Sequence, residues 1–130
     1  MTQTTFKLEE KKIKIVPIIT DNKGDLREFS FILDTGATVS VVNEDVAIRL
    51  GYDVRTLNKE NLVTIGGKTS TRKLRLPKIE LLGKVIENLD VRVIAMPIQV
   101  SMFLDGLIGM DFLLKLKHLN IDFEEQTIEV

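Results

Sequence analysis

Short apolar and β-branched runs, separated by polar residues and glycines, recur along most of the chain. Each run has the length and composition of a strand. The expected strands cover residues 12–20, 29–33, 39–42, 62–65, 71–79, 85–94, 107–108, 119–123 and 127–130. We therefore expect an all-β protein, whose first hairpin loop lies at residues 21–25, where Asp, Asn and Gly gather.

Two short helices are expected to interrupt the strands. Asn43 suits an N-cap, acidic residues follow it, and Gly51 provides a C-terminal stop, which predicts a helix over residues 44–50. Asp111 is expected to cap a second helix over residues 112–117. The helices contribute little to the fold class, which stays mostly β.

Size and charge narrow the possible organisation and partners. The chain has 130 residues, of which 44% are hydrophobic, as expected for a single domain over residues 1–130. The formal net charge of -1 gives no general attraction for nucleic acid or for an anionic membrane. We therefore expect neither nucleic acid nor a membrane as a partner.

The composition also limits the chemistry. The sequence has no cysteine and one histidine, which argues against disulfides, thiol nucleophiles, cysteine-based zinc sites and histidine-paired triads. We expect no metal and no cofactor, so carboxylate chemistry remains. No apolar run has the length of a signal sequence or a transmembrane span, and together with the missing cysteines this predicts a cytoplasmic protein.

The strongest chemical signal is an apolar strand that leads into Asp34-Thr35-Gly36. Gly36 allows the backbone to bend sharply or to approach another chain closely. A carboxylate at the end of a rigid strand suits catalysis. The competing interpretation is that Asp34 only stabilises a turn by accepting hydrogen bonds from its own backbone.

The segment from Phe31 to Ser40 resembles the active-site loop of retropepsins, the retroviral and retroelement branch of aspartic proteases. Residues 104–113 are similar to the second signature of that family, and residues 64–69 to its flap, a mobile hairpin that closes over substrate. The resemblance extends from about residue 12 to residue 130. It implies an all-β, closed-barrel-like acid protease fold with two short helices, in which the chain is a single-lobe subunit of a homodimer.

The resemblance further implies an enzyme, an aspartic endopeptidase that hydrolyses extended peptide or protein substrates. Hydrolysis without a metal or a covalent intermediate needs two carboxylates, so a second subunit would supply the other Asp34. The catalytic residues implied are Asp34, Thr35 and Gly36. The substrate-binding residues implied are Ala37, Thr38, Val39, Ile65, Gly66, Gly67, Leu107 and Ile108. Thr35 is expected to bond across the dimer axis, and Thr38 to orient the Asp34 carboxylate.

Several alternatives stay open. The chain could be a catalytically inactive retropepsin-fold module that serves dimerisation or peptide binding, because a fold does not guarantee activity. Gly66-Gly67 could form an ordinary turn. Asp105 lies where a second catalytic carboxylate would fall in a bilobal enzyme, although a turn role is preferred. The family commonly has Arg after the second-signature glycine, whereas this chain has Met110, so the dimer must be braced differently.

A small β-barrel that binds nucleic acid is the third class. Such a protein needs a basic face with stacking aromatic residues. Lys73 and Arg75 alternate onto one face of an expected strand, but the chain has one Tyr and no Trp. A solvated sheet surface is the preferred interpretation of this row.

Overall fold

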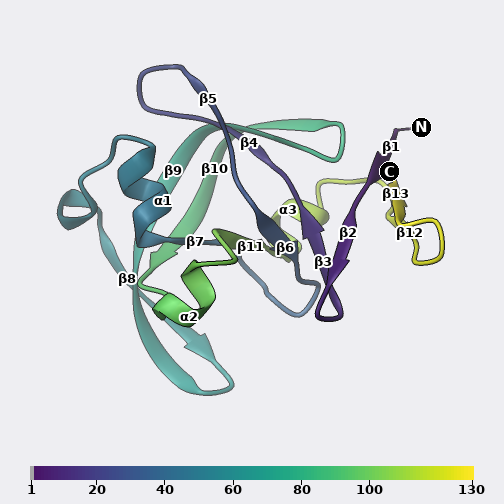
Figure 1. Cartoon of the computed structure of the whole chain (residues 1–130). Helices are drawn as coiled ribbons and strands as arrows, with labels where there is room; N and C mark the ends of the chain where they lie inside the picture. Colours follow the sequence, from purple (N-terminus) through teal and green to yellow (C-terminus); the bar gives the residue numbers. More distant parts are fainter. Residues whose placement is uncertain (1) are drawn as a thin grey trace.

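The computed structural model describes residues 2–130, and strands dominate it (Figure 1). One sheet has ten strands and the other has three. The strands are β1 (Gln3–Thr5), β2 (Lys7–Glu9), β3 (Lys12–Ile15), β4 (Ile18–Thr20), β5 (Leu26–Glu28), β6 (Phe31–Leu33), β7 (Val41–Asn43), β8 (Lys59–Thr64), β9 (Gly67–Leu81), β10 (Lys84–Ile94), β11 (Gly106–Ile108), β12 (Asn120–Asp122) and β13 (Thr127–Glu129). The predicted all-β class is confirmed.

The large sheet brings distant parts of the sequence together. Its order is β2-β3-β6-β11-β7-β10-β9-β4-β5, and β8 pairs with β9 outside this path. Strands β6 and β11 are parallel neighbours, as are β7 and β10, whereas the other pairs are antiparallel. The β6 and β11 pairing places the two segments that resemble retropepsin signatures side by side.

The prediction of a closed barrel is wrong, because the large sheet stays open. Its order ends at β2 and β5, which do not pair with each other. All side chains of these two short strands are exposed, so neither has a buried face that would favour closure. The expected strand over residues 12–20 is also divided at Pro17, which has no backbone N–H for a sheet ladder.

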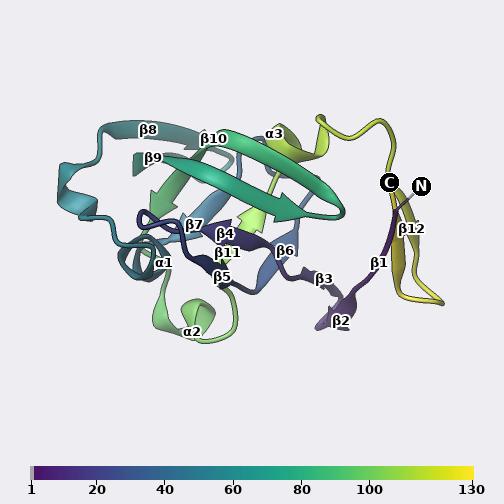
Figure 2. The same ribbon diagram turned by 90° about the horizontal axis from the view of Figure 1, so that it is seen from above.

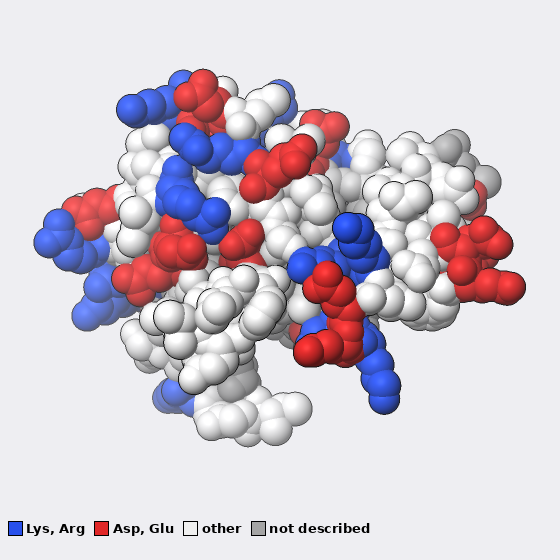
Figure 3. All heavy atoms as spheres, viewed as in Figure 1, with Lys and Arg blue, Asp and Glu red and all other residues white. Residues whose placement is uncertain are grey.

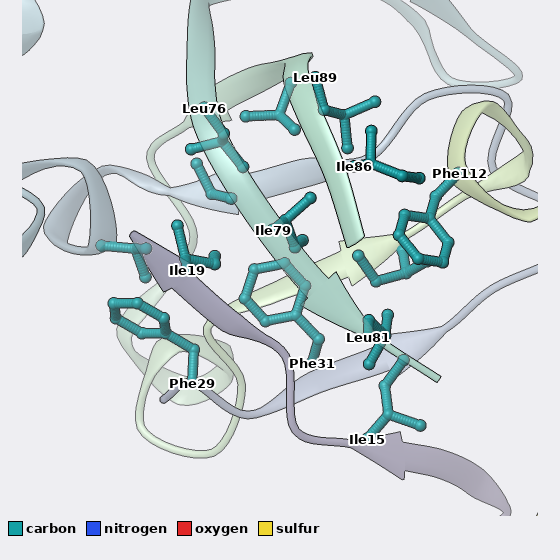
Figure 4. Packing of buried hydrophobic residues seen from close by; sticks show 14 of the residues in the cluster. Ile15, Ile19, Phe29, Phe31, Leu76, Ile79, Leu81, Ile86, Leu89 and Phe112 are labelled. Carbon is teal, nitrogen blue, oxygen red and sulfur yellow. The ribbon is translucent and has the colours of Figure 1, made fainter. Parts of the chain in front are cut away.

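The core lies against one face of the long β9–β10 hairpin. Ile79 of β9 faces Phe31 of β6, and Phe112 closes the same cluster from the carboxy-terminal part of the chain (Figure 4). Phe31 and Phe112 are both at most 1% exposed. Burying one aromatic side chain of this size stabilises a fold by about 2–3 kcal/mol. The strand that leads to Asp34 is therefore firmly anchored.

The helices are short and partly differ from the prediction. The first predicted helix is present as α1 (Glu44–Arg49), preceded by Asn43 at the N-cap position. The second is α3 (Met110–Leu113), which begins before Asp111, so the prediction that Asp111 is its N-cap is wrong. The sequence analysis did not predict α2 (Ile98–Ser101) or the 3-10 helix η1 (Val54–Thr56). Within residues 2–130, no helix is both long enough and apolar enough to span a membrane.

The three-stranded sheet joins the two ends of the described chain. Its order is β1-β13-β12, with both pairs antiparallel. Two backbone bonds extend this pairing, from Thr2 N to the Val130 oxygen at 3.2 Å and from Val130 N to the Thr2 oxygen at 3.0 Å. Figures 1 and 2 show this sheet at one side of the molecule. The strand expected at residues 127–130 thus pairs within its own chain in this structure.

Candidate active site

Asp34 lies directly after β6, at the end of a strand with a buried core face. Its backbone N–H donates to the Ile108 oxygen at 2.9 Å, which continues the β6–β11 pairing by one residue. Its own backbone oxygen accepts from Ala37 N at 3.2 Å, closing a turn. Asp34 is half-buried and Thr35 is exposed. The local fold therefore presents the carboxylate at the surface on a fixed backbone.

The carboxylate of Asp34 is held by its own loop. Gly36 N donates to Asp34 Oδ1 at 2.9 Å, as in an Asx-turn. A Cβ atom at Gly36 would lie 3.2 Å from the same oxygen, tighter than an ordinary contact. Glycine at this position thus lets the backbone approach the carboxylate and donate to it.

A second segment of the chain supports the Asp34 loop. Leu107 and Ile108 of β11 pair with Ile32 and Leu33 of β6 in parallel register. After β11, Met110 N donates to the Ala37 oxygen at 2.7 Å. Because two segments far apart in the sequence share these bonds, the loop can take its final shape only when β11 and α3 are in place.

Gly109 marks the closest approach between these two segments. A Cβ atom there would lie 2.7 Å from the Ala37 oxygen and 2.8 Å from the Val39 oxygen. Both atoms belong to the backbone and cannot rotate away. Glycine is therefore required at the junction of β11 and α3 by close packing against the Asp34 loop.

Ser40 and Asp111 form a polar contact at this junction that the sequence analysis missed. Ser40 N donates to Asp111 Oδ2 at 2.9 Å, and Ser40 Oγ donates to Asp111 Oδ1 at 2.7 Å. The carboxylate also accepts from Phe112 N at 2.8 Å. The only local signal in the sequence was a serine inside the apolar run Val39–Val42.

The predicted site residues fall into two groups in the structure. Asp34 to Val39 form the loop, with Ala37 and Val39 half-buried and Thr38 exposed. Leu107 is half-buried beneath it, and Ile108 is fully buried in the core. Thr38 contacts α3 through its backbone oxygen, which accepts from Asp111 N at 3.2 Å.

The second group lies at the tip of the β8–β9 hairpin. Thr64 pairs with Gly67, which leaves Ile65 and Gly66 as a two-residue turn. Gly67 has φ of +112°, a conformation that favours glycine. Ile65 is fully exposed, and the hairpin extends beyond the body of the molecule (Figure 1). A protruding hairpin with an apolar tip has the form of a flap. The backbone of an ordinary two-residue turn would be the same, so both interpretations of Gly66-Gly67 fit this hairpin.

Asp105 is remote from Asp34 within the chain. Its Oδ2 accepts from Ser30 N at 2.8 Å, and its Oδ1 accepts from Arg49 Nη2 at 2.9 Å. Asp105 therefore lies beside Ser30, and Asp34 lies four residues after Ser30, beyond the far end of β6. At about 3.3 Å per residue the two backbones are roughly 13 Å apart. The contacts of Asp105 are structural, but they join distant segments and are not those of the local turn that was predicted.

Both residues of the basic row on β9, Lys73 and Arg75, contact the same carboxylate, that of Asp90. Arg75 Nε donates to Asp90 Oδ1 at 2.9 Å, and Lys73 Nζ lies 3.5 Å from Asp90 Oδ2. The hydrogen bond from Arg75 is the main reason why the pKa of Asp90 is lowered. On the face in Figure 3, basic and acidic side chains are interspersed. The contacts of Arg75 and Lys73 with Asp90 fit the solvated-sheet interpretation of the row.

Two cavities lie elsewhere on the chain. One of about 730 Å³ lies between the β2–β3 hairpin and the α2 segment, and its lining includes Lys14, Ile32 and Phe103. The other, of about 610 Å³, is lined by β1, β3 and the turn after β9. Neither is lined by Asp34. Within residues 2–130, no group of three or more acidic or histidine side chains is arranged to hold a metal ion.

Comparisons with known proteins agree with the geometry. The sequence profile described as Aspartyl protease matches residues 18–112. No curated protein matches the chain. Among solved structures, the crystal structure of a retropepsin-like aspartic protease from Rickettsia conorii is similar, with a TM-score of 0.72 at 18% sequence identity. The similarity covers 97% of this chain and 87% of that one. With its Asp34 loop held between β6 and β11, the chain belongs to the aspartyl protease family and has the retropepsin-like fold.

Proposed function

We propose that the chain is one subunit of a homodimeric aspartic endopeptidase, in which Asp34 of each subunit contributes to a shared site. The observation that supports this proposal is the single Asp-Thr-Gly sequence, presented half-exposed at the end of a rigid strand. Asp105 and Asp111, which lie in the second-signature segment, both use their carboxylates to bind backbone N–H groups. Neither is available as a partner for Asp34 within the chain.

The dimer follows from the chemistry of the reaction. Metal-free hydrolysis of a peptide needs one carboxylate to activate water and a second, protonated one to donate to the carbonyl oxygen. Two carboxyl groups a few ångströms apart keep one proton between them, because both cannot easily ionise. A twofold axis beside Asp34 would provide this pair and is the commonest symmetry of homo-oligomers.

The other site residues have supporting roles in this proposal. The exposed Thr35 bonds across the axis and locks the two loops together. Gly36 binds substrate through its backbone, and Ile65 at the hairpin tip closes over it. The substrate is an extended peptide segment that adds as a strand, with large apolar side chains beside the cleaved bond. A cytoplasmic location stays a prediction, which is based on the lack of long apolar runs together with the absence of cysteine.

Cleavage of a denatured protein mixture tests the enzyme. The parent and Asp34→Asn are compared between acid and neutral pH, and only the parent should produce new peptides. Asp53→Asn is a matched control, because Asp53 also accepts from the backbone N–H two residues ahead, at 3.1 Å, in a different part of the chain. Identical peptide patterns from the parent and Asp34→Asn would refute the enzyme. Peptide binding without cleavage would instead support the inactive module.

Sedimentation tests the dimer without any substrate. A dimer should form reversibly as the concentration rises at neutral pH, and Asp34→Asn should still associate, since Thr35 is retained. A parent that stays monomeric at high concentration would leave each Asp34 without a partner and would exclude the shared site.

A further inference from the structure

We propose that the contact between Ser40 and Asp111 positions Asp34, and that it braces the active-site loop where the family commonly has an arginine. The inference rests on the proposed function, since it assigns a role in that same site. Ser40 ends the Asp34 loop and is 0% exposed. Asp111 lies in the first turn of α3. Their two hydrogen bonds link the end of the loop to the helix.

Ser40 is the centre of a small hydrogen-bonded network. Its Oγ donates to Asp111 Oδ1 at 2.7 Å and accepts from Gly109 N at 3.0 Å, while its N–H donates to Asp111 Oδ2 at 2.9 Å. Within residues 2–130, no cation lies within ion-pair distance of Asp111. The Asp111 carboxylate accepts hydrogen bonds from Ser40 and from Phe112 N. Bonds to an ionised acceptor are roughly twice as strong as neutral ones, and burial excludes competing water.

The same segment holds the rest of the loop. Asp34 N donates to the Ile108 oxygen at 2.9 Å, Met110 N donates to the Ala37 oxygen at 2.7 Å, and Asp111 N donates to the Thr38 oxygen at 3.2 Å. The loop is thus attached to residues 108–111 at its start, at its middle and, through Ser40, at its end. Releasing the Ser40 contact detaches this end of the loop from α3, while the bond from Arg92 N to the Ser40 oxygen at 3.0 Å still holds it to β10.

A change at Ser40 reaches the reacting group because the Asp34 carboxylate is positioned by the loop. Asp34 Oδ1 accepts its hydrogen bond from Gly36 N, which belongs to the same loop. Any displacement of the loop therefore moves the carboxylate with it. In a shared site the displacement occurs in both subunits and changes the separation of the two carboxyl groups. Catalytic geometry must be held to within about 0.5 Å, so chemistry suffers before substrate binding does.

Three substitutions remove the contact in steps. Asp111→Asn keeps one acceptor oxygen, Asp111→Ala removes both, and Ser40→Ala removes the hydroxyl. We expect kcat to fall between about tenfold and about a hundredfold, least for Asp111→Asn, which is the conservative variant. KM should change by less than about threefold, because the groups that bind the peptide backbone are retained. Thermal denaturation and sedimentation of each variant establish that it is folded and dimeric before its kinetic constants are compared with those of the parent.

Asp21→Asn is the matched control. Asp21 is also buried and accepts from two backbone N–H groups, those of Lys23 and Asp25, each at 2.9 Å, in the turn between β4 and β5. This variant should lose comparable stability while kcat stays within about twofold of the parent value. Equal losses of kcat in Asp111→Asn and Asp21→Asn would show a purely structural effect and overturn the proposal.

Hydrogen exchange gives a result that does not depend on activity. The amides of Asp34 and Met110 should exchange faster in Asp111→Asn and Ser40→Ala than in the parent, and not in Asp21→Asn. If the parent cleaves nothing, the proposed function fails by itself, and the exchange rates still decide whether Ser40 and Asp111 hold the loop. Unchanged protection of both amides would overturn the brace whatever the activity.

Discussion

Replacing Gly109 with alanine tests how tightly β11 and α3 hold the Asp34 loop. The backbone of Gly109, with φ of -105° and ψ of -168°, is open to alanine, so the effect is steric. The new methyl group would lie 2.7 Å from the Ala37 oxygen and 2.8 Å from the Val39 oxygen. Ordinary contact begins at 3.4 Å, so the segments must separate by more than half an ångström.

The expected cost can be worked out from these contacts. Overpacking of this kind costs about 1–3 kcal/mol. Moving the Ala37 oxygen also stretches its 2.7 Å bond from Met110 N, which adds roughly 1 kcal/mol. Alanine restricts the unfolded chain and offsets about 0.4–1 kcal/mol of this loss. We expect a net loss of about 2 kcal/mol in the free energy of unfolding, and a melting temperature lower by about 6–12 °C for a chain of this size.

Urea denaturation followed by circular dichroism measures this loss, with Gly36→Ala as the comparison. At Gly36 the nearest atom is the movable Asp34 Oδ1 at 3.2 Å, so its stability should change by less than about 1 kcal/mol. Activity should fall in both variants. A Gly109→Ala protein as stable as Gly36→Ala would refute the close packing of loop and helix.

Three further outcomes are expected. Ile65→Ser should leave the free energy of unfolding within about 0.5 kcal/mol of the parent value, because the side chain is fully exposed. The same change should raise KM by up to about tenfold, and an unchanged KM would favour the ordinary turn. Thr35→Ala should raise the dimer dissociation constant in sedimentation by about tenfold or more, since symmetry removes its bond twice, and unaltered association would count against that role. Burial raises the pKa of Asp21, but hydrogen bonds from Asp25 and Arg27 outweigh burial, so the net pKa lies below its ordinary value of 3.8. The stability that a lowered pKa contributes is present above pH 3.8 and is lost as the pH falls through the folded-state pKa. On acidification, the urea midpoint of Asp21→Asn should therefore fall by less than that of the parent. Equal falls of the two midpoints would contradict this assignment.

The sequence predicted best what neighbouring residues determine. The turn over residues 21–25 forms as expected, because Asp21 Oδ1 accepts from the backbone N–H groups of Lys23 and Asp25. Helix α1 follows Asn43 as expected, but the Asn43 side chain makes no cap bond and accepts instead from Met96 N at 2.9 Å. The position of a cap can thus be read locally, whereas the partner of a side chain depends on the tertiary fold.

Contacts between distant residues were the part that could not be predicted. Asp111 before an apolar stretch has the local pattern of a helix cap, but its carboxylate binds Ser40, which is 71 residues away in the sequence. Helix α3 ends at Leu113, although the apolar and basic pattern would have continued it to residue 117. Strands β1, β2 and β5 were not predicted, because each has three mostly polar residues and so shows no clear alternation of apolar and polar positions.

The parallel pairing of β6 with β11 also has a consequence for biosynthesis. Residues 31–33 emerge from the ribosome long before residues 106–108, and the Asp34 loop lacks its supporting strand until then. Such long-range pairings form late, because closing the intervening loop costs chain entropy first. A nascent or truncated polypeptide would therefore carry an unformed Asp34 loop until translation has passed α3.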